Sequence, residues 1–348
     1  MLDVSTAEKK DILSLELPQL KQVLEANGEK GFRAKQIFEW LHKRRVMSFD
    51  DMTNISLELR KKLSERFYIE NIHEVRRLKS DIDDTEKFLF ELSDGNHVET
   101  VLMSYEHGDS LCVSTQVGCK MGCKFCASTI AGFKRSLKAS EILLQLYEAE
   151  RVSGRKVSSI VLMGIGEPLD NYDNVLSFLN ILSSESGTNM SLRHVSLSTC
   201  GIVDRIKDLS KLGLGLTLSI SLHATNDKKR SELMPINQRY NISELMSACH
   251  DYFDATGRRI SFEYALIDGE NDSDADAKAL AELTGGMPSH INIIPVNKIK
   301  ERSYTSSRAA AVRFSKRLND LGVNATVRRT LGADIDAACG QLRREYEI

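Results

Sequence analysis

The length, composition and charge of the chain exclude several classes of protein. Its 348 residues are 41% hydrophobic, which is enough for a packed core, so a disordered or collagen-like chain is excluded. The 47 basic and 49 acidic residues leave a net charge of -2, which by itself does not mark a nucleic-acid binder. The longest apolar run, Ile160–Ile165, is far below the roughly 18 residues that span a bilayer. Because no signal peptide is visible at the start, a cytoplasmic protein without a membrane partner is expected.

The first 70 residues predict a small helical domain. Apolar residues recur at near-helical spacing around Leu13–Val23, and residues 34–41 repeat the pattern. Between Lys30 and Arg45, one acid, Glu39, stands against six basic residues, namely Lys30, Arg33, Lys35, Lys43, Arg44 and Arg45. Such a basic patch can neutralise nucleic-acid phosphates, although a solvated helix face has the same composition. A smaller basic cluster consists of Lys298, Lys300, Arg302 and Arg308.

Residues 71–105 predict a β-hairpin that connects two domains. The strand-like runs Lys87–Leu92 and Val98–Leu102 flank the turn signal Ser93–Asn96. Glu99 lies on the second run, where a glutamate is most simply explained as an exposed side chain.

Residues 106–348 alternate between strand-like and helical patterns. The expected strands are Leu111–Gln116, Ser158–Met163, His194–Ser198, Leu214–Leu222, Ile260–Ile267, His290–Val296 and Ala325–Arg329. The expected helices include Ser140–Glu150, with Ser140 as N-cap, Asn174–Leu182, Ser243–Phe253 and Arg308–Leu321. About six such β–α units predict an α/β fold with a parallel sheet, either open or rolled into a partial barrel. In such folds the site lies at the C-terminal ends of the strands.

Cys119, Cys123 and Cys126 form a C-x3-C-x2-C motif just after the first of these strands. Three thiolates this close together can hold a soft metal, and the flanking Gly118 and Gly122 let the loop wrap tightly. Disulfides are not expected without an export signal. A structural zinc needs a fourth ligand, and no second knuckle follows. A [4Fe–4S] cluster with one open iron is favoured, while zinc and unligated thiols remain alternatives.

Several longer motifs accompany the cysteines in one order along the chain. They occupy Cys112–Cys119, Gly164–Asn171, Leu197–Thr199, Ser221–Ala224, Met234–Asn237 and Asp334–Leu342. With the C-x3-C-x2-C motif they resemble the radical S-adenosylmethionine (SAM) superfamily and, within it, the bacterial dual-specificity RNA adenine-C2 methyltransferases. The resemblance runs from about residue 10 to about residue 343. A Rossmann interpretation of Gly164 and Gly166 is weak, because Leu169 stands where the third glycine belongs.

The resemblance implies an incomplete (β/α)6 radical SAM barrel behind a small N-terminal helical domain. It implies that Cys119, Cys123 and Cys126 hold a [4Fe–4S] cluster and that the open iron holds the amino and carboxylate groups of SAM. It also assigns a set of residues to SAM binding, namely Gly166, Glu167, Ser198, Ser221, Leu222, His223 and Asn297.

The resemblance further implies two reactive cysteines and a proton acceptor. Cys339 takes a methyl group from one SAM, a radical made from a second SAM activates that methyl, and the resulting carbon radical adds to C2 of the adenine. Glu99 accepts a proton, and Cys112 displaces Cys339 by forming a transient disulfide. Read alone, Cys112 is a small buried hydrophobe, as Cys200 and Cys249 are expected to be.

The implied substrates are adenosine 2503 of 23S rRNA and adenosine 37 of certain tRNAs, gripped by the basic patch. The implied electron donor is flavodoxin or ferredoxin, and a monomer is expected. One alternative is the sister enzyme that methylates adenine C8 and confers antibiotic resistance. That enzyme has Ala where this chain has Pro168, and Cys where this chain has Val117. Both positions of this chain therefore favour C2. A zinc-bearing RNA-binding protein without catalysis is the alternative from another class, and iron and sulfide analysis separates it from the enzyme.

Overall fold

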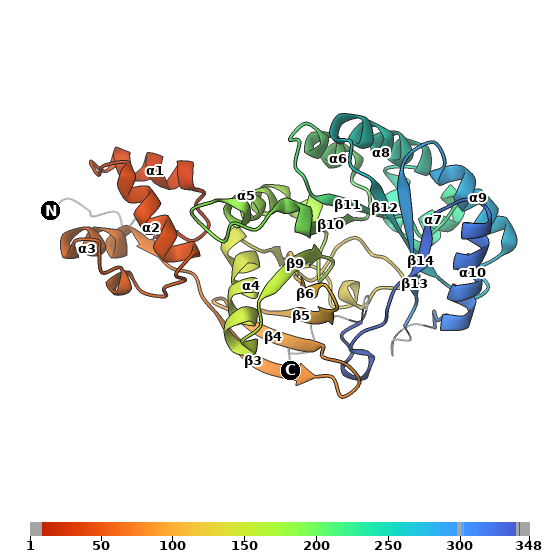
Figure 1. Cartoon of the computed structure of the whole chain (residues 1–348), viewed down its shortest axis with the longest axis horizontal. Coiled ribbons are helices and arrows are strands. Elements are labelled where there is room, and N and C mark those ends of the chain that lie inside the picture. Colours follow the sequence, from red (N-terminus) through yellow and green to blue (C-terminus); the bar gives the residue numbers. More distant parts are fainter. Residues whose placement is uncertain (1–8, 298–300, 302, 339–340, 342–348) are drawn as a thin grey trace.

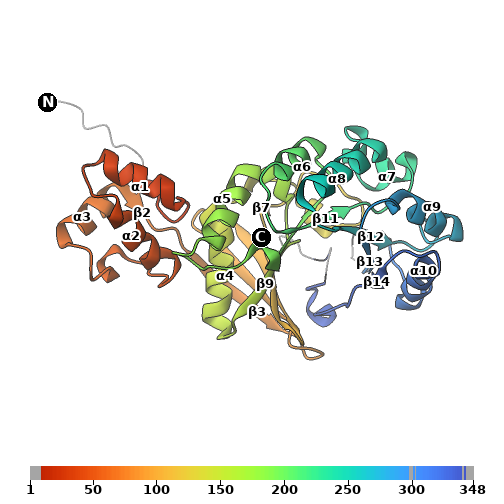
Figure 2. The ribbon, with the colours of Figure 1, turned by 45° about the horizontal axis from the view of Figure 1, so that its top comes forward.

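The computed structural model describes residues 9–297, 301, 303–338 and 341. Its N-terminal part is mainly helical, is called the helical domain below, and lies at one end of the molecule beside α4 and α5 (Figures 1 and 2). Two short parallel strands, which the helical pattern did not predict, pair the beginning of this domain with its end. The elements are β1 (Lys10–Asp11), α1 (Leu17–Ala26), α2 (Phe32–His42), α3 (Leu57–Arg66) and β2 (Phe67–Tyr68).

One ten-stranded sheet carries the rest of the described chain, in the order β14-β13-β12-β11-β10-β9-β6-β5-β4-β3. The strands from β6 to β14 in this order are parallel, whereas β3, β4 and β5 pair in antiparallel fashion and continue the same sheet. The predicted hairpin is therefore the antiparallel edge of the barrel sheet. The strands are β3 (Ile72–Lys79), β4 (Glu86–Leu92), β5 (His97–Tyr105), β6 (Gly108–Cys112), β9 (Val157–Leu162), β10 (Val195–Thr199), β11 (Thr217–Ser221), β12 (Ile260–Leu266), β13 (Ser289–Pro295) and β14 (Ala325–Val327).

Helices follow the parallel strands and cover the outer face of the sheet (Figure 1). They are α4 (Ala139–Ser153), α5 (Tyr172–Ser183), α6 (Val203–Ser210), α7 (Asp227–Leu233), α8 (Ile242–Thr256), α9 (Asp274–Thr284) and α10 (Arg308–Asp320). Six parallel strands are each followed by at least one α-helix before the next parallel strand, namely β6, β9, β10, β11, β12 and β13. The predicted (β/α)6 partial barrel is therefore confirmed. Within the described residues, no helix is long and apolar enough to cross a bilayer.

The parallel strands alternate in a way that makes room for a site. In β11, Leu218 and Ile220 are buried in the main core, while Ser221 lines a cavity inside the barrel. In β12, Phe262 belongs to the same core and Glu263 lines the cavity. Successive side chains of a strand point to opposite faces, so the apolar set meets the helices and the smaller or polar set faces inward. The barrel interior therefore contains a cavity near the strand ends, lined by polar side chains such as Ser221 and Glu263 together with apolar ones.

Two local predictions were wrong in detail. The strand expected at Leu111–Gln116 runs from Gly108 to Cys112. Beyond it the chain leaves the barrel sheet, and β7 (Gln116–Val117) pairs with β8 (Arg135–Ser136). The N-cap of α4 is Lys138 and not Ser140, because the Lys138 N–H donates to the carboxylate of Glu141 (2.8 Å) and starts the helix earlier.

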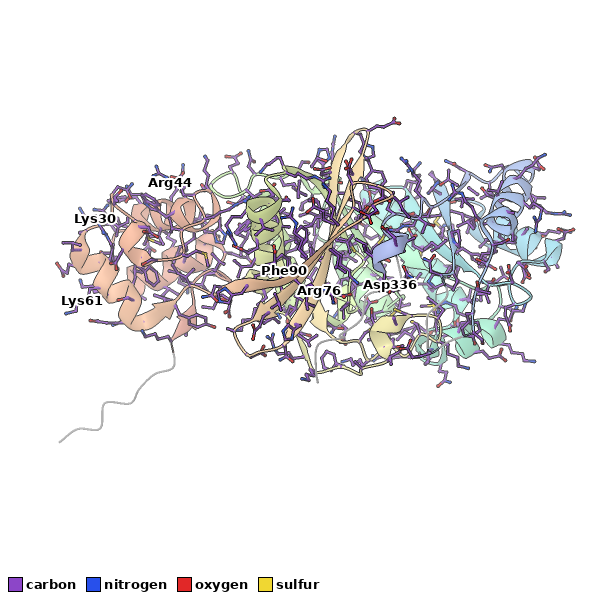
Figure 3. The ribbon with its side chains drawn as sticks, turned by 90° about the horizontal axis from the view of Figure 1, so that it is seen from below. Lys30, Arg44, Lys61, Arg76, Phe90 and Asp336 are labelled. Carbon is purple, nitrogen blue, oxygen red and sulfur yellow. The ribbon has the colours of Figure 1, made fainter. Side chains whose placement is uncertain are left out.

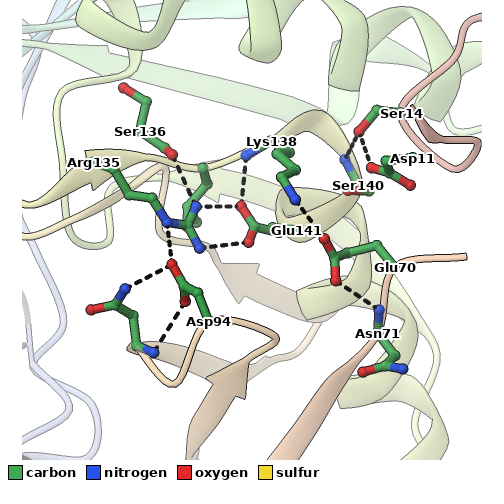
Figure 4. Close-up of polar contacts among 12 residues, drawn as sticks. Asp11, Ser14, Glu70, Asn71, Asp94, Arg135, Ser136, Lys138, Ser140 and Glu141 are labelled. Carbon is green, nitrogen blue, oxygen red and sulfur yellow. Dashed lines mark hydrogen bonds and ion pairs between the residues drawn. The ribbon is translucent and has the colours of Figure 1, made fainter. Parts of the chain in front are cut away.

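Partly buried ion pairs join the helical domain and the hairpin to the start of α4 (Figure 4). Lys138 Nζ lies 2.8 Å from Glu70 Oε2, at the end of the helical domain. Arg135 donates to the fully buried Glu141 carboxylate (2.8 Å) and lies 2.6 Å from Asp94 in the β4–β5 turn. Glu70 and Glu141 are buried carboxylates that would be left without a counter-charge if Lys138 or Arg135 were removed, so these contacts help to hold both parts against the barrel.

Candidate active site

A cavity opens at the C-terminal ends of the parallel strands, where the sequence predicted the site. It holds about 1080 Å³ of space, part of which is open to solvent, and Cys119, Cys123 and Cys126 all line it. The residues predicted to bind SAM that line the same cavity are Gly166, Glu167, Ser198, Ser221, His223 and Asn297. Leu222 is the exception, because its side chain is fully buried in the main hydrophobic core. The strand order thus gathers residues from the middle and the end of the chain around the cysteine loop.

Glycines shape the cysteine loop. Gly118 has a φ of +74°, and a Cβ there would overlap the carbonyl oxygen of Gly132, so a larger residue has no room. A hydrogen bond also anchors the loop, because the Lys124 N–H donates to the Leu233 carbonyl at the end of α7 (2.9 Å). The close fit at Gly118 and this hydrogen bond both fix the loop, and its three thiols lie at one wall of the cavity.

The thiols of this loop are in an environment that suits a metal cation. Burial raises the pKa of Cys119 to about 12, with the nearby Cys126 thiol adding to the effect. Burial also raises the pKa of Cys123 well above its usual value. A positive metal centre converts such thiols to thiolates, and three thiolates are a soft donor set. Among the described residues no group of three His, Cys, Asp or Glu side chains can hold one metal ion, whereas a cluster is held at several irons, each of which takes its own thiolate.

The Glu167 carboxylate is buried and held by backbone donors. Oε1 accepts from the Leu169 N–H (3.0 Å) and Oε2 from the Cys200 N–H at the end of β10 (2.7 Å). Burial raises the pKa of Glu167, and these hydrogen bonds act against that rise. The carboxylate therefore points in one direction at the cavity wall, where an ammonium group is the matching partner.

His223 lies at the end of β11 in a left-handed conformation, with a φ of 57°. Its Nδ1 accepts from the Ala265 N–H (2.8 Å), and its ring meets Phe125 edge to face at 4.8 Å. Burial lowers the pKa of His223 to about 3, so the ring is neutral at physiological pH. Because Nδ1 is the acceptor, the proton is on Nε2 and the ring is a neutral donor.

Two charged residues of the cavity were missed by the sequence analysis. Glu263 on β12 is buried and accepts from Asn292 Nδ2 (2.8 Å), and Arg328 Nη1 lies 3.8 Å from it. Burial raises the pKa of Glu263. A carboxylate inside an otherwise apolar strand pattern was the signal that could have marked it.

Arg230 is a third missed residue, and it supports the cavity from behind. Its fully buried guanidinium donates to the carbonyls of Cys200 (2.8 Å), Ser221 (3.2 Å) and Leu222 (3.1 Å). It also donates to Asn237 Oδ1 (3.0 Å). One side chain from α7 therefore fixes the ends of β10 and β11, the strands that present Ser198, Ser221 and His223.

A second group of predicted residues lies on the antiparallel side of the sheet and does not line the main cavity. Cys112 is buried in a small cluster that also contains Val101 of β5 and Ala337 of the C-terminal segment. Glu99 is buried too, with its Oε1 3.2 Å from Lys87 Nζ, so its expected exposure was wrong. Cys339 lies outside the described residues. Ala337, two positions before it, is nevertheless packed against the cluster of Cys112.

The basic patch of the helical domain is only partly exposed. Lys30, Lys35 and Lys43 are exposed, and Lys30 and Arg44 lie on this domain in Figure 3. Arg45 differs, because it pairs with Glu150 of α4 (2.7 Å) and stacks on Tyr147. Its charge is therefore used to join the domains. In the second basic cluster, Lys298, Lys300 and Arg302 lie outside the described residues, and Arg308 is the first residue of α10.

Comparisons with known proteins agree with this architecture. A family model described as the N-terminal domain of ribosomal RNA large subunit methyltransferases matches residues 10–69, and a Radical SAM superfamily model matches residues 113–281. A probable dual-specificity RNA methyltransferase RlmN from Lachnoclostridium phytofermentans is 50% identical over 343 residues, covering 98% of this chain and 96% of its own. The relative of that name from Clostridium perfringens (strain 13) is 51% identical over 338 residues, 97% of each chain.

Among solved structures, a radical SAM methyltransferase from Sphaerobacter thermophilus superposes with a TM-score of 0.90 at 42% identity, covering 97% of this chain and 100% of its own. The fold and the cysteine-lined cavity are thus those of a radical SAM enzyme. Within that superfamily, the chain belongs to the RlmN family of dual-specificity RNA methyltransferases. Membership implies an iron–sulfur cluster and SAM, and the three cavity-lining thiols and the oriented Glu167 carboxylate fit both groups.

Proposed function

We propose that the chain methylates C2 of adenosine 2503 in 23S rRNA and of adenosine 37 in tRNAs, through an S-methylated Cys339 and a transient disulfide with Cys112. The observation that carries the proposal is the cavity in which Cys119, Cys123 and Cys126 face the ends of β9, β10 and β11. The kinship with RlmN proteins over 97–98% of the chain supports the choice of substrate.

The cofactor roles follow from the cavity. Cys119, Cys123 and Cys126 would hold a [4Fe–4S] cluster, leaving one iron for SAM. Bound there, the cluster and SAM would supply the radical chemistry that activates the methyl group. The Glu167 carboxylate binds the ammonium group of SAM, while Ser198, the strand end at Ser221 and Asn297 border the remaining space. A flavodoxin or ferredoxin is the proposed electron donor.

The remaining steps belong to side chains of this chain. Adenine C2 is electron-poor and cannot attack the methyl group of SAM, so a cysteine must carry the methyl first. The Cys339 thiolate attacks the methyl carbon of one SAM, and the sulfonium keeps the electron pair of the broken bond. After the methylene carbon has joined C2, the Glu99 carboxylate takes the C2 proton, and the unpaired electron of the adduct would return to the cluster. The Cys112 thiolate then attacks the Cys339 sulfur, the S–C bond breaks with its electron pair on the carbon, and that carbon takes up a proton to become the methyl group of the released base.

RNA enters as a hairpin loop or anticodon stem-loop, from which one base is turned into the cavity. The exposed lysines of the basic patch bind the backbone phosphates. Because both groups of reactive residues lie in one chain, we propose that a monomer suffices. Its rRNA and tRNA substrates place it in the cytoplasm.

Mass spectrometry of 23S rRNA tests the proposal against the C8 alternative. A strain that lacks this chain should contain unmodified adenosine at position 2503, and restoring the chain should produce 2-methyladenosine there. Pro168 and Val117, which differ from the Ala and Cys of the C8 enzyme, support this outcome. Appearance of 8-methyladenosine instead would show that the C2 assignment is wrong.

The basic patch supplies a separate prediction on RNA affinity. Replacing Lys30, Lys35 and Lys43 by Glu should weaken binding of an rRNA hairpin. It should also make the negative slope of log K against log salt less steep by about 2 to 3, because each phosphate contact contributes roughly 0.7–0.9 to its magnitude. Fluorescence anisotropy at several salt concentrations measures both quantities.

The control for this prediction is Lys316→Glu on α10, which should leave the affinity and its slope unchanged. Arg45 is left intact, because its pair with Glu150 joins the two domains. If the triple reversal binds RNA with the wild-type slope, the patch is a solvated helix face.

A further inference from the structure

We propose that Lys87 is a positioning residue that holds the Glu99 carboxylate ionised and ties it to the chain segment in front of Cys339. The inference rests on the proposed role of Glu99 as proton acceptor. Lys87 is a lysine on β4 with a side chain that is only 10% exposed, which is rare for this residue type. Neither the motifs nor the cavity assigns it a function.

Lys87 contacts two parts of the chain at once. Its Nζ lies 3.2 Å from Glu99 Oε1 on the neighbouring strand and also donates to the carbonyl oxygen of Asp336 (3.2 Å). The side chain of Glu99 is 6% exposed. A carboxylate buried to this degree takes up a proton unless a nearby cation favours its ionised form. Lys87 supplies that cation.

The segment that contains Asp336 is docked on the hairpin that carries Lys87. Asp334 Oδ1 accepts from Ser80 Oγ and its Oδ2 from the Asp81 N–H, both at 2.8 Å, and the Gly332 N–H donates to Asp83 Oδ2 (3.1 Å). Figure 3 shows Asp336 beside the antiparallel strands. Cys339 follows three positions later in the sequence.

These contacts place Lys87, the cation that pairs with Glu99, next to the segment that leads to Cys339, the proposed methyl carrier. In the step concerned, the C2–H bond breaks, its proton passes to the Glu99 carboxylate and its electron pair restores the aromatic purine, while the unpaired electron of the adduct would return to the cluster proposed above. A Glu99 that is already protonated cannot accept it. Lys87 neither gives nor takes a proton, and its contribution is to keep the acceptor charged beforehand.

The charges around Glu99 come from several elements. Side chains at alternate positions of a strand share a face, so His97 and Val101 lie on the face of Glu99. Val101 is paired with Lys87 of β4 and with Cys112 of β6, so both of these residues face the same side of the sheet. The titratable and charged groups on the elements around this face, among the described residues, include Arg76 on β3, Lys87 and Glu91 on β4, His97 and Tyr105 on β5, Cys112 on β6, and Arg328, Arg329 and Asp336.

The test compares Lys87→Gln, which keeps a hydrogen-bond donor without the charge, with Lys87→Arg, which keeps the charge. Methyl transfer to RNA by Lys87→Gln should be at least tenfold slower than wild type at pH 7 and should recover toward pH 9, because higher pH restores the carboxylate. Lys87→Arg should stay within about threefold of wild type at both pH values. Glu99→Gln should be inactive throughout, with a loss of about 10²–10⁴-fold.

Difference infrared spectroscopy measures the protonation state of Glu99 without any turnover of the enzyme. At pH 7, wild-type protein should lack a protonated-carboxyl band assignable to Glu99, and Lys87→Gln should gain one that is absent from Lys87→Gln/Glu99→Gln. The wild-type measurement also tests the inference without any Lys87 variant. If wild-type protein at pH 7 shows a protonated-carboxyl band that disappears in Glu99→Gln, Glu99 is protonated and the inference is wrong.

Arg77→Met is the matched control, because Arg77 pairs with the buried Glu86 of the same strand as Lys87 (2.5 Å). It should leave the pH profile of methyl transfer unshifted, and a shift equal to that of Lys87→Gln would overturn the specific role of Lys87. If Glu99→Gln is inactive while Lys87→Gln shows the wild-type profile, the Lys87 inference is wrong and the proposed function stands. If Glu99→Gln remains active, the proposed role of Glu99 itself fails.

Discussion

Replacing any one of Cys119, Cys123 or Cys126 by alanine should strip the protein of its iron. Anaerobically prepared wild-type protein should carry about four iron and four sulfide per chain, and each variant close to none. The reason is geometric, because the three thiols at one wall of the cavity form the whole protein ligand set proposed for the cluster. Iron and acid-labile sulfide analysis, together with the visible absorption of the cluster, measures the effect.

Cys200→Ala is the matched control for this experiment. Cys200 lines the same cavity and is buried, yet it lies at the end of β10, away from the cysteine loop in the chain. Its variant should keep the full iron content. Intact clusters in all three loop variants would show that the ligand assignment is wrong, and zinc in place of iron would support the non-catalytic alternative.

Loss of Cys112 and loss of Cys339 should stop methyl transfer at different steps. Cys339→Ala lacks the methyl carrier, so it should bind SAM and transfer nothing to RNA. Cys112→Ala keeps the carrier but lacks the thiol that releases it, so a covalent protein–RNA adduct should accumulate. A denaturing gel after one turnover separates the adduct from free protein.

The packing around Cys112 supports this distinction. A disulfide requires Cα atoms roughly 4.4–6.8 Å apart, and the two cysteines are separated by 227 positions (339 − 112). Ala337 shares the small cluster of Cys112, so the C-terminal segment reaches this place two residues before Cys339. The double variant Cys112→Ala/Cys339→Ala should form no adduct, and Cys249→Ala, in the main core, should behave as wild type. An inactive Cys112→Ala enzyme without adduct would leave Cys112 as a packing residue.

The sequence by itself predicted the barrel units, the helical domain and the cysteine loop. These features rest on local patterns. Strand and helix periodicities extend over fewer than twenty residues, and the C-x3-C-x2-C spacing confines three thiols to one loop whatever the rest of the chain does. The family resemblance pointed to Glu167, Ser198 and Ser221, the rule that sites lie at the C-terminal ends of parallel strands agreed with it, and in the structure these residues line the same cavity as the cysteine loop.

Only the tertiary structure decided which distant residues meet. Lys87 and Asp336 are 249 positions apart, and Glu263 on β12 meets Arg328, which follows the edge strand β14. Even where such a residue stands out locally, as Glu263 does in its apolar strand pattern, nothing near it in the sequence names its partner. The same holds for Arg230, whose helix pattern does not show that it holds the ends of β10 and β11. Contacts of this kind depend on strand order and on the path of the whole chain, because a buried charge is stable only where that path brings its partner to it.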